Sequence, residues 1–362
     1  MNVAVHTPDA VGERMAGPGI RAWHLAGELA AHFPTTLVAR REGGLPGQAG
    51  FRVLTHGTRE AAAALRDADV LVGQPARNFR RLRRGQWMVY DLFDPVLLEL
   101  REMYGRTPSM RQRIHLEAER WRVRRALGGG DLLIVAFAKQ RELYADARAA
   151  IIEVPFGVEE MQPAGARENI VLWGGGAWEW LDPATAVEAV IAANQAGVAC
   201  KLLFLGRSRP NRHMIERRRE DRLDQLIRHG APYVEANAEW VPYRERLSWL
   251  RRSKIAMMLH RPTAEAPYSI RTRLFDAIAA EVPIITTEEG FAAELVAAEG
   301  LGVVVPPGNS GAAADAVIRL LRDDAFHARC VTNLARIRPR FAWEVVTRPL
   351  IEVLSQWQKQ TD

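Results

Sequence analysis

Short apolar runs alternate with helix-like segments along the whole chain, in two successive cycles. Strands buried on both faces of a sheet read as continuous apolar runs, and their alternation with helices is typical of parallel sheets. We expect strands at 2–6, 35–38, 51–55, 70–73, 87–92, 132–137 and 151–154, then at 170–173, 200–205, 234–236, 255–259, 282–286 and 302–305. The pattern predicts an α/β fold of two doubly wound halves facing a cleft, with ligands at the carboxyl ends of the strands.

Helices are expected between these strands, at 19–31, 59–64, 95–103, 109–127, 138–147, 183–196, 214–229, 244–251, 273–280, 291–299, 310–323 and 325–337. A length of 362 residues also indicates about two domains. We place them at 1–160 and 168–340, because the polar segment 157–168 between them contains Gly and Pro. A last helical segment, in 341–362, follows both cycles, and Pro349 is expected to kink it or delay its start.

The cysteine and histidine patterns argue against several classes of protein. Cys200 and Cys330 are isolated, which favours a reducing compartment over a disulfide framework or a zinc site. The nine histidines show no metal-ligand spacing, so no metal site is predicted. The sequence has neither a signal-peptide pattern nor an apolar run long enough for a membrane helix, so we expect a cytoplasmic protein.

Arginine dominates a net charge of +6. One cluster spans 77–84 and another spans 111–125. Glu117 and Glu119 interrupt the second cluster, which favours a solvated helix face there. For the first cluster, a surface that meets anionic lipid stays an alternative, so peripheral contact with a membrane is left open. Nucleic acid is not expected, because the basic stretches are not interleaved with aromatic residues.

One glycine-rich stretch follows the first strand of each half. Gly17 and Gly19 lie in the first, and the second contains Gly174, Gly175 and Gly176 followed by Trp178. Neither is a GxGxxG fingerprint with an acidic residue about 20 positions later, so NAD binding is disfavoured. Glycine still lets a backbone approach a ligand closely, and a following helix favours an anion. A tight turn is the structural alternative for either stretch alone.

The segment from Glu265 to Thr287, EAPYSIRTRLFDAIAAEVPIITT, concentrates charge near the start of one expected helix. Its candidate site residues are Glu265, Arg271, Thr272, Arg273 and Asp276. Guanidinium groups and helix N–H groups favour phosphate, and carboxylates accept hydrogen bonds from sugar hydroxyls. The segment therefore predicts one end of a nucleotide-sugar site.

Several motifs occur in an order that resembles the GT-B glycosyltransferases, in a branch similar to glycosyltransferase family 4. They are MAGPGIRAWHLAGEL, YDLFDPVLLEL, VPFGV, VLWGGGAWEWLDP, LFLGRSRPN, WVPYRERLSWL and EAPYSIRTRLFDAIAAEVPIITT. The resemblance implies two Rossmann-like domains, with the acceptor bound mainly by the first and a nucleotide sugar mainly by the second. It also implies a final helix that crosses back to the first domain, retention of anomeric configuration and no metal or other cofactor.

The resemblance also assigns roles to residues. Gly174–Gly176 match the loop that approaches the donor diphosphate, with Trp178 beside it as a stacking candidate. Arg207 matches the basic residue that stabilises the leaving diphosphate, and Arg212 is a second candidate. Glu265 matches the acidic residue that faces the transferred sugar. Asp276 stands where a ribose-binding glutamate is usual, and Arg271 and Arg273 are placed at the phosphates.

In the first domain, Asp94 is the candidate cleft-facing acid, with Asp91 second, because both end an expected strand. For both aspartates, capping of the next helix, with Pro95 at its first position, is the alternative. The sequence thus predicts a transferase that moves a sugar from a nucleotide-diphosphate donor to a hydroxyl of a glycan, a lipid-linked glycan or a small molecule. A nucleotide-sugar epimerase and a non-catalytic nucleotide-sugar-binding protein remain alternatives.

Overall fold

The computed structural model describes residues 1–45, 47, 50–160, 165–206 and 217–361, with the backbone alone for residues 42, 217–221 and 361. The chain divides into two compact units. Unit 1 comprises Met1–Gly157 and Trp343–Asp362, and unit 2 comprises Val158–Ala342. The chain therefore changes unit twice, once at Gly157 and once at Trp343.

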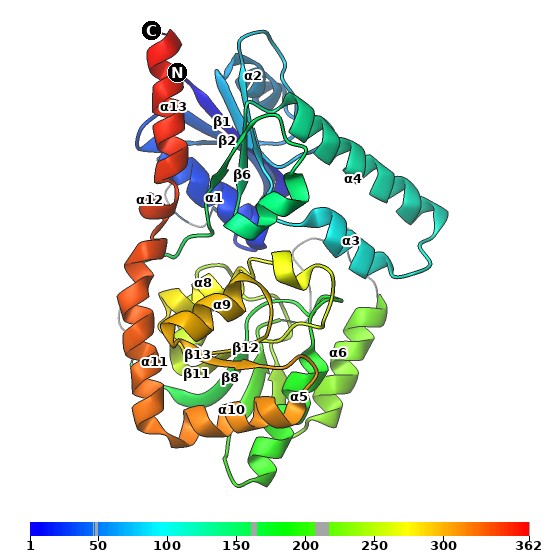
Figure 1. Ribbon diagram of the computed structural model, residues 1–362, viewed down its shortest axis with the longest axis vertical. Coiled ribbons are helices and arrows are strands. Elements are labelled where there is room, and N and C mark those ends of the chain that lie inside the picture. The colour runs from blue at the N-terminus through cyan, green and yellow to red at the C-terminus, as the bar shows by residue number, and fades with distance from the viewer. Residues whose placement is uncertain (46, 48–49, 161–164, 207–216, 362) are drawn as a thin grey trace. The chain divides into compact units, whose positions relative to one another are not determined.

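Unit 1 contains a seven-stranded sheet in the order β3-β2-β1-β4-β5-β6-β7, and every pairing is parallel (Figure 1). Its strands are β1 (Val3–Gly12), β2 (Thr35–Glu42), β3 (Arg52–Thr55), β4 (Val70–Gly73), β5 (Trp87–Asp91), β6 (Leu132–Val135) and β7 (Ala150–Glu153). Its helices are α1 (Gly17–Ala30), α2 (Arg59–Asp67), α3 (Val96–Tyr104), α4 (Met110–Gly129), the 3-10 helix η1 (Ala138–Tyr144), α12 (Trp343–Val346) and α13 (Arg348–Thr361).

Unit 2 contains a six-stranded parallel sheet in the order β10-β9-β8-β11-β12-β13. Its strands are β8 (Glu168–Trp173), β9 (Lys201–Phe204), β10 (Val234–Ala236), β11 (Ser253–Met258), β12 (Ile284–Thr287) and β13 (Gly302–Val305). Its helices are α5 (Pro183–Gln195), α6 (Arg217–His229), α7 (Arg246–Arg252), η3 (Ala266–Tyr268), α8 (Arg273–Ala279), α9 (Gly290–Glu299), α10 (Ser310–Arg322), α11 (Asp324–Ile337) and η4 (Arg338–Phe341).

The two parallel sheets confirm the doubly wound α/β architecture. The central strands β4 and β11 bury nearly all of their side chains, and β8 buries its last three, which explains why these stretches read as continuous apolar runs. The expected helix at 138–147 is wrong in type, because η1 is a 3-10 helix. The first strand is longer than expected: β1 continues to Gly12 after a register shift between His6 and Ala10.

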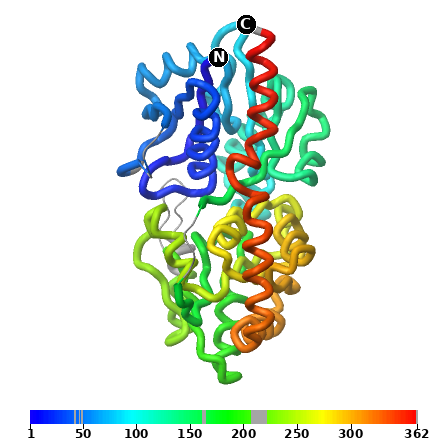
Figure 2. Tube along the Cα trace, turned by 90° about the vertical axis from the view of Figure 1, so that its left-hand side faces the viewer, coloured from blue at the N-terminus to red at the C-terminus, as the bar shows by residue number. Residues whose placement is uncertain are grey.

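The C-terminal segment packs on unit 1. Figure 2 shows it in red beside the elements of that unit. The rings of Trp343 and His24 stack at 4.8 Å, and those of Trp357 and Trp87 stack at 4.4 Å. Helix α12 ends at Val346 and α13 begins at Arg348, so Pro349 lies in the first turn of α13, as expected of a proline that delays a helix.

Candidate functional site

The strand order of unit 2 creates a switch point beside β8. The chain leaves β8 towards β9 and β10 on one side, and it returns to β11 on the other side. Ligands of doubly wound sheets bind outside the carboxyl ends of the strands at such a point. The segments that follow β8 and β11 border it, and they contain Gly174–Gly176, Glu265 and the residues up to Arg273.

The glycine loop begins where β8 ends, at Trp173. Gly175 has φ +100°, which L side chains rarely adopt, and a Cβ on it would lie 3.3 Å from Nε of Arg273. A Cβ on Gly174 would meet no heavy atom of the described residues within 4 Å. The Trp173 indole N–H donates to the Gly176 carbonyl at 3.2 Å. The loop is therefore anchored at Gly175 and Gly176, while its backbone stays open at Gly174.

Arg273 is the first residue of α8, in the segment that follows β11, and it contacts this glycine loop. Its Nη2 donates to the Gly176 carbonyl, and its guanidinium carbon lies 5.4 Å from the centre of the Trp173 ring. Its Nη1 is buried and has no hydrogen-bond acceptor among the residues that the structure describes. Burial lowers the pKa of Arg273 to about 10, with Asp276 opposing the shift, so the group is still cationic at neutral pH.

Arg271 has different surroundings, although the sequence placed both arginines at the phosphates. It is buried with φ +50°, and it donates to Thr286 Oγ1 at 2.6 Å and to the carbonyls of Thr287 and Glu289 at 2.9 and 3.0 Å. Burial lowers the pKa of Arg271 to about 10, and the Glu265 carboxylate opposes the shift. These contacts fix the end of β12, and a phosphate contact of Arg271 stays a prediction.

Glu265 and Thr272 border the same point. Glu265 is fully buried directly before η3, and its charge is one of those that stabilise the Arg271 cation. Thr272 is the N-cap residue of α8, and its side chain makes no capping hydrogen bond. Helix α8 has only seven residues. Its dipole is therefore a minor source of anion affinity compared with the charges of Arg271 and Arg273.

His260 and Thr263 each contribute one polar atom to this part of unit 2. The sequence marked His260 only weakly and did not mark Thr263. His260 Nδ1 and Thr263 Oγ1 are buried and lack a hydrogen-bond partner within the described part of the chain. Burial, reinforced by Arg271 and Arg273, holds the pKa of His260 well below its usual value, so its imidazole is neutral. Only the position of His260 at the end of an apolar strand signalled it, and nothing in the sequence distinguished Thr263.

Asp276 belongs to a second polar cluster in unit 2. It accepts a hydrogen bond from Nε of Arg246 at 3.3 Å, and Arg246 also pairs with Glu159. The Tyr243 hydroxyl donates to Glu159 at 2.5 Å. Burial works to lower the pKa of Arg246, but Asp276, Tyr243 and Glu159 together raise it above its usual value. Asp276 is thus held by an arginine that the sequence did not single out, and its ribose contact stays a prediction.

Three further candidates of unit 2 remain as predictions. Arg207 and Arg212 lie outside the described residues. Trp178 is partly buried and stacks on Trp180, with ring centres 5.4 Å apart and nearly parallel planes.

In unit 1 the first glycine stretch is a helix start and not a separate loop. Gly17 and Gly19 lie in the first turn of α1. A Cβ on Gly19 would overlap with the Ala10 carbonyl of β1, so this glycine permits close packing of helix on strand. The packing explains Gly19 without a ligand, and ligand contact by Gly17 and Gly19 stays a prediction.

The two aspartates at the end of β5 differ. Asp91 is buried in a bidentate ion pair with Arg21, at 2.6 Å from its Nε and 3.0 Å from its Nη2, so it has a structural partner. Asp94 is partly buried, and the catalytic role given to it stays a prediction. The capping alternative is wrong in its register, since Pro95 is itself the N-cap residue of α3 and the helix begins at Val96.

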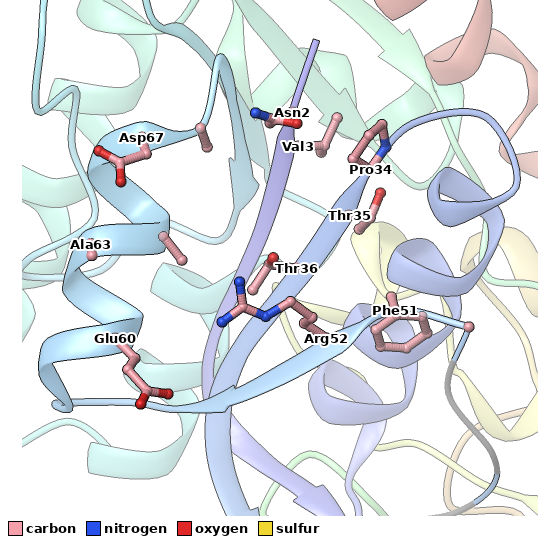
Figure 3. Close-up of a pocket in the computed structure, with 13 residues that line it drawn as sticks. Asn2, Val3, Pro34, Thr35, Thr36, Phe51, Arg52, Glu60, Ala63 and Asp67 are labelled. Atoms are coloured by element: carbon pink, nitrogen blue, oxygen red, sulfur yellow. The ribbon is translucent and has the colours of Figure 1, made fainter.

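A cavity of about 740 Å³ in unit 1 lies away from these residues (Figure 3). Asn2, Thr35 and Arg52 line it at the amino ends of β1, β2 and β3, and Glu60 and Asp67 of α2 face it. Ligands of doubly wound sheets bind at the opposite, carboxyl edge. We therefore do not assign the candidate site to this cavity.

Among the described residues no group of three or more His, Cys, Asp or Glu is placed to hold a metal ion, and no described helix is long and apolar enough to cross a membrane.

Solved structures with the same architecture identify the fold class. Sucrose-phosphate synthase of Thermosynechococcus elongatus is similar with a TM-score of 0.65 and 17% identity, over 99% of both chains. Anabaena HepE in complex with UDP and glucose has a TM-score of 0.70 and 13% identity, over 98% of this chain and 100% of the other. An α,α-trehalose-phosphate synthase (UDP-forming) of Burkholderia vietnamiensis has a TM-score of 0.59 and 11% identity, over 97% and 99%. The fold is therefore GT-B.

The sequence itself gives the class of enzyme. Residues 168–323, most of unit 2, match the family described as Glycosyl transferases group 1. With this domain on a GT-B fold, the protein is a glycosyltransferase, as the motifs predicted. Comparison with curated protein sequences gives no significant match.

Proposed function

We propose that this glycosyltransferase takes its sugar from a nucleoside-diphosphate donor bound at the switch point of unit 2, and transfers it to a hydroxyl acceptor. The observation that carries the proposal is Arg273, a partly buried cation that touches the Gly174–Gly176 loop, and its buried Nη1 has no acceptor among the described residues. A buried cationic N–H beside open glycine backbone suits a diphosphate, which supplies both charge and acceptor oxygens.

The chemistry explains why such a group matters. Negative charge develops on the departing nucleoside diphosphate as its bond to the anomeric carbon breaks, and a preorganised cation stabilises it in the transition state. Glu265 would face the transferred sugar, and Arg207 would share the leaving-group charge, as the family resemblance implies. Anabaena HepE, whose structure contains UDP and glucose, supports a nucleotide-sugar donor by analogy.

Retention of anomeric configuration and independence from metal ions also belong to the proposal. Both rest on the family resemblance, as does an acceptor that is a glycan, a lipid-linked glycan or a small molecule. Proton NMR of the first product formed distinguishes retention from inversion. Turnover that persists in excess EDTA supports a metal-independent reaction, and its loss contradicts it.

The first test measures nucleotide binding through the melting temperature. A ligand that binds only the folded state stabilises it by RT ln(1 + [L]/Kd), so the matching nucleoside diphosphate raises the melting temperature in a series of such compounds. Arg273→Gln should abolish that rise and lower the rate of transfer by roughly 10²–10³-fold. Arg252→Gln, which breaks an exposed ion pair with Glu168, is the matched control and should keep both.

Four outcomes would contradict the proposal. The donor site is wrong if no nucleoside diphosphate shifts the melting temperature of the wild type, or if Arg273→Gln binds as the wild type does. Donor that is isomerised without acceptor would indicate an epimerase. Donor that is bound but never consumed, with any acceptor class, would indicate a binding protein. The melting temperatures without ligand report whether each variant folds.

A further inference from the structure

Helix α4 of unit 1 exposes large apolar side chains to solvent. Met110, Ile114 and Trp121 are 71%, 62% and 57% exposed, and with Leu82 they are the large exposed hydrophobic residues of the described chain. Single exposed apolar residues are common on protein surfaces, but three on one helix form a patch that calls for a partner. Figure 1 shows α4 on the outer side of unit 1, and its C-terminal half packs on the sheet through Val123 and Ala126.

The three residues share one side of the helix. At about 100° per residue, Met110, Ile114 and Trp121 fall within an arc of about 40°. The buried residues of α4 are Leu116, Val123 and Ala126, and they occupy the opposite side of the helix, which faces the core of unit 1. Helix α4 is therefore apolar on two opposite sides, and only one of them packs against unit 1.

Arginines flank the exposed apolar side. Helix α4 carries six arginines and two glutamates. Arg120 and Arg122 pair with Glu117 and Glu119, whereas Arg111, Arg113 and Arg124 are exposed and form no ion pair with any described residue. The glutamates had favoured a plain solvated face. The ion pairs show that they neutralise only two of the six arginines.

The other arginine cluster of unit 1, at 77–84, adjoins the same helix. Arg125 Nη2 donates to the carbonyls of Ala76 and Phe79 at 2.8 and 2.7 Å, and its guanidinium carbon lies 4.8 Å from the centre of the Trp121 ring. The loop that follows Phe79 is exposed. It contains Leu82 and the arginines Arg80 and Arg84, which form no ion pair with a described residue. The helix and the loop thus present cationic and apolar groups next to each other.

We propose that the exposed side of α4, with the 80–84 loop, binds the surface of an anionic lipid bilayer. Apolar side chains at the head-group boundary combined with arginines on anionic lipid give interfacial binding, and tryptophan favours that boundary. Charge complementarity selects this occupant. A polynucleotide would match the charge but gain little from Met110 and Ile114, and a second copy of this chain would bring like charge against like. The surface would hold the enzyme where a lipid-linked acceptor lies, and its binding needs no nucleotide.

Co-sedimentation with vesicles tests this proposal without donor or acceptor. The wild type should sediment with vesicles of phosphatidylglycerol and phosphatidylcholine, far less with phosphatidylcholine alone, and less in high salt, since the ionic component is screened. Ile114→Ser combined with Trp121→Ser should reduce binding at least tenfold. The triple change Arg111→Gln, Arg113→Gln and Arg124→Gln should do the same.

The matched control removes three exposed arginines elsewhere, by Arg228→Gln, Arg329→Gln and Arg348→Gln, and should bind vesicles like the wild type. Equal loss in this control would show a net-charge effect and overturn the proposal. A wild type that ignores anionic vesicles would overturn it too. In that case a gel shift with RNA would indicate that a polynucleotide binds this surface. A dimer in sedimentation velocity that Ile114→Ser and Trp121→Ser dissociate would indicate a second copy of this chain. Because no arm contains nucleotide, failure here leaves the proposed donor site untouched.

Discussion

Single buried charges hold the key segments of both units in place. In unit 1, Arg21 is 1% exposed and pairs with Asp91, and its Nη1 and Nη2 also donate to the carbonyls of Pro155 and Val154 at 3.0 and 2.9 Å. In unit 2, Arg271 binds the end of β12 in the same manner. A buried charge costs much desolvation unless it is paired and hydrogen-bonded, so removal of one partner is far worse than loss of an exposed pair.

Asp91→Asn should therefore lower the free energy of unfolding by about 3 kcal/mol, because it leaves the Arg21 charge buried without its counter-ion. Glu153→Gln is the matched control, since Glu153 pairs with Arg141 at 3.1 Å but both side chains are about 40% exposed. It should cost less than about 1 kcal/mol. Urea denaturation measures both values, and equal costs for the two variants would show that the Arg21 pair is not the anchor we describe.

At the scale of elements, two neighbouring glycines in the turn from β8 towards α5 have different roles. Gly175 has a positive φ of +100°, which places the loop against Arg273. A Cβ on Gly174, by contrast, would meet no heavy atom of the described residues within 4 Å. The element boundaries themselves followed well from apolar periodicity, as in β4 and β10, where the expected and observed ranges agree. Periodicity failed at β1, where the expected strand ended at His6, although pairing with β2 resumes at Ala10 after a register shift and continues to Gly12.

The two glycines should respond differently to alanine. Gly175→Ala forces a strained backbone and is expected to cost about 1–3 kcal/mol of stability. Gly174→Ala should leave the melting temperature of the free protein nearly unchanged, but weaken nucleoside-diphosphate binding because a methyl group then stands where backbone meets ligand. Melting curves with and without nucleotide measure both effects. The reverse pattern, with Gly174→Ala the less stable protein, would contradict the geometry.

At the scale of the whole molecule, unit 1 is completed by the far end of the chain. Trp343, Val346, Leu350 and Leu354 are buried in it, and a Cβ on Gly157 would overlap with the Trp343 ring. The two points where the chain changes unit are also adjacent, because the Val158 N–H donates to the Phe341 carbonyl at 2.8 Å. The stability of unit 1 thus depends on residues nearly 200 positions beyond its other boundary.

Truncation after Ala342 should expose the apolar surface of unit 1 that α12 and α13 cover. Burial of each large apolar side chain contributes about 1.5–3 kcal/mol, so loss of four of them should unfold unit 1 or lower its melting temperature strongly. Unit 2 keeps all of its own residues and should stay folded. Hydrogen exchange read by mass spectrometry checks this, because faster exchange is expected in 1–157 and unchanged exchange in the core strands of unit 2. Uniform loss of protection would show that the units do not fold separately.

The sequence was enough to predict the two doubly wound sheets, the order of their elements and the glycosyltransferase motifs, because buried parallel strands must be apolar and helices must alternate with them. It also placed Gly174–Gly176 and Arg273 at one site. Only the tertiary structure distinguished Arg271, which donates to the end of β12, from Arg273, which touches the glycine loop. It also paired Asp91 with Arg21 and Asp276 with Arg246, and it showed which side of α4 is covered. Such assignments depend on partners far away in the sequence, whose contacts no local spacing of residue types can specify.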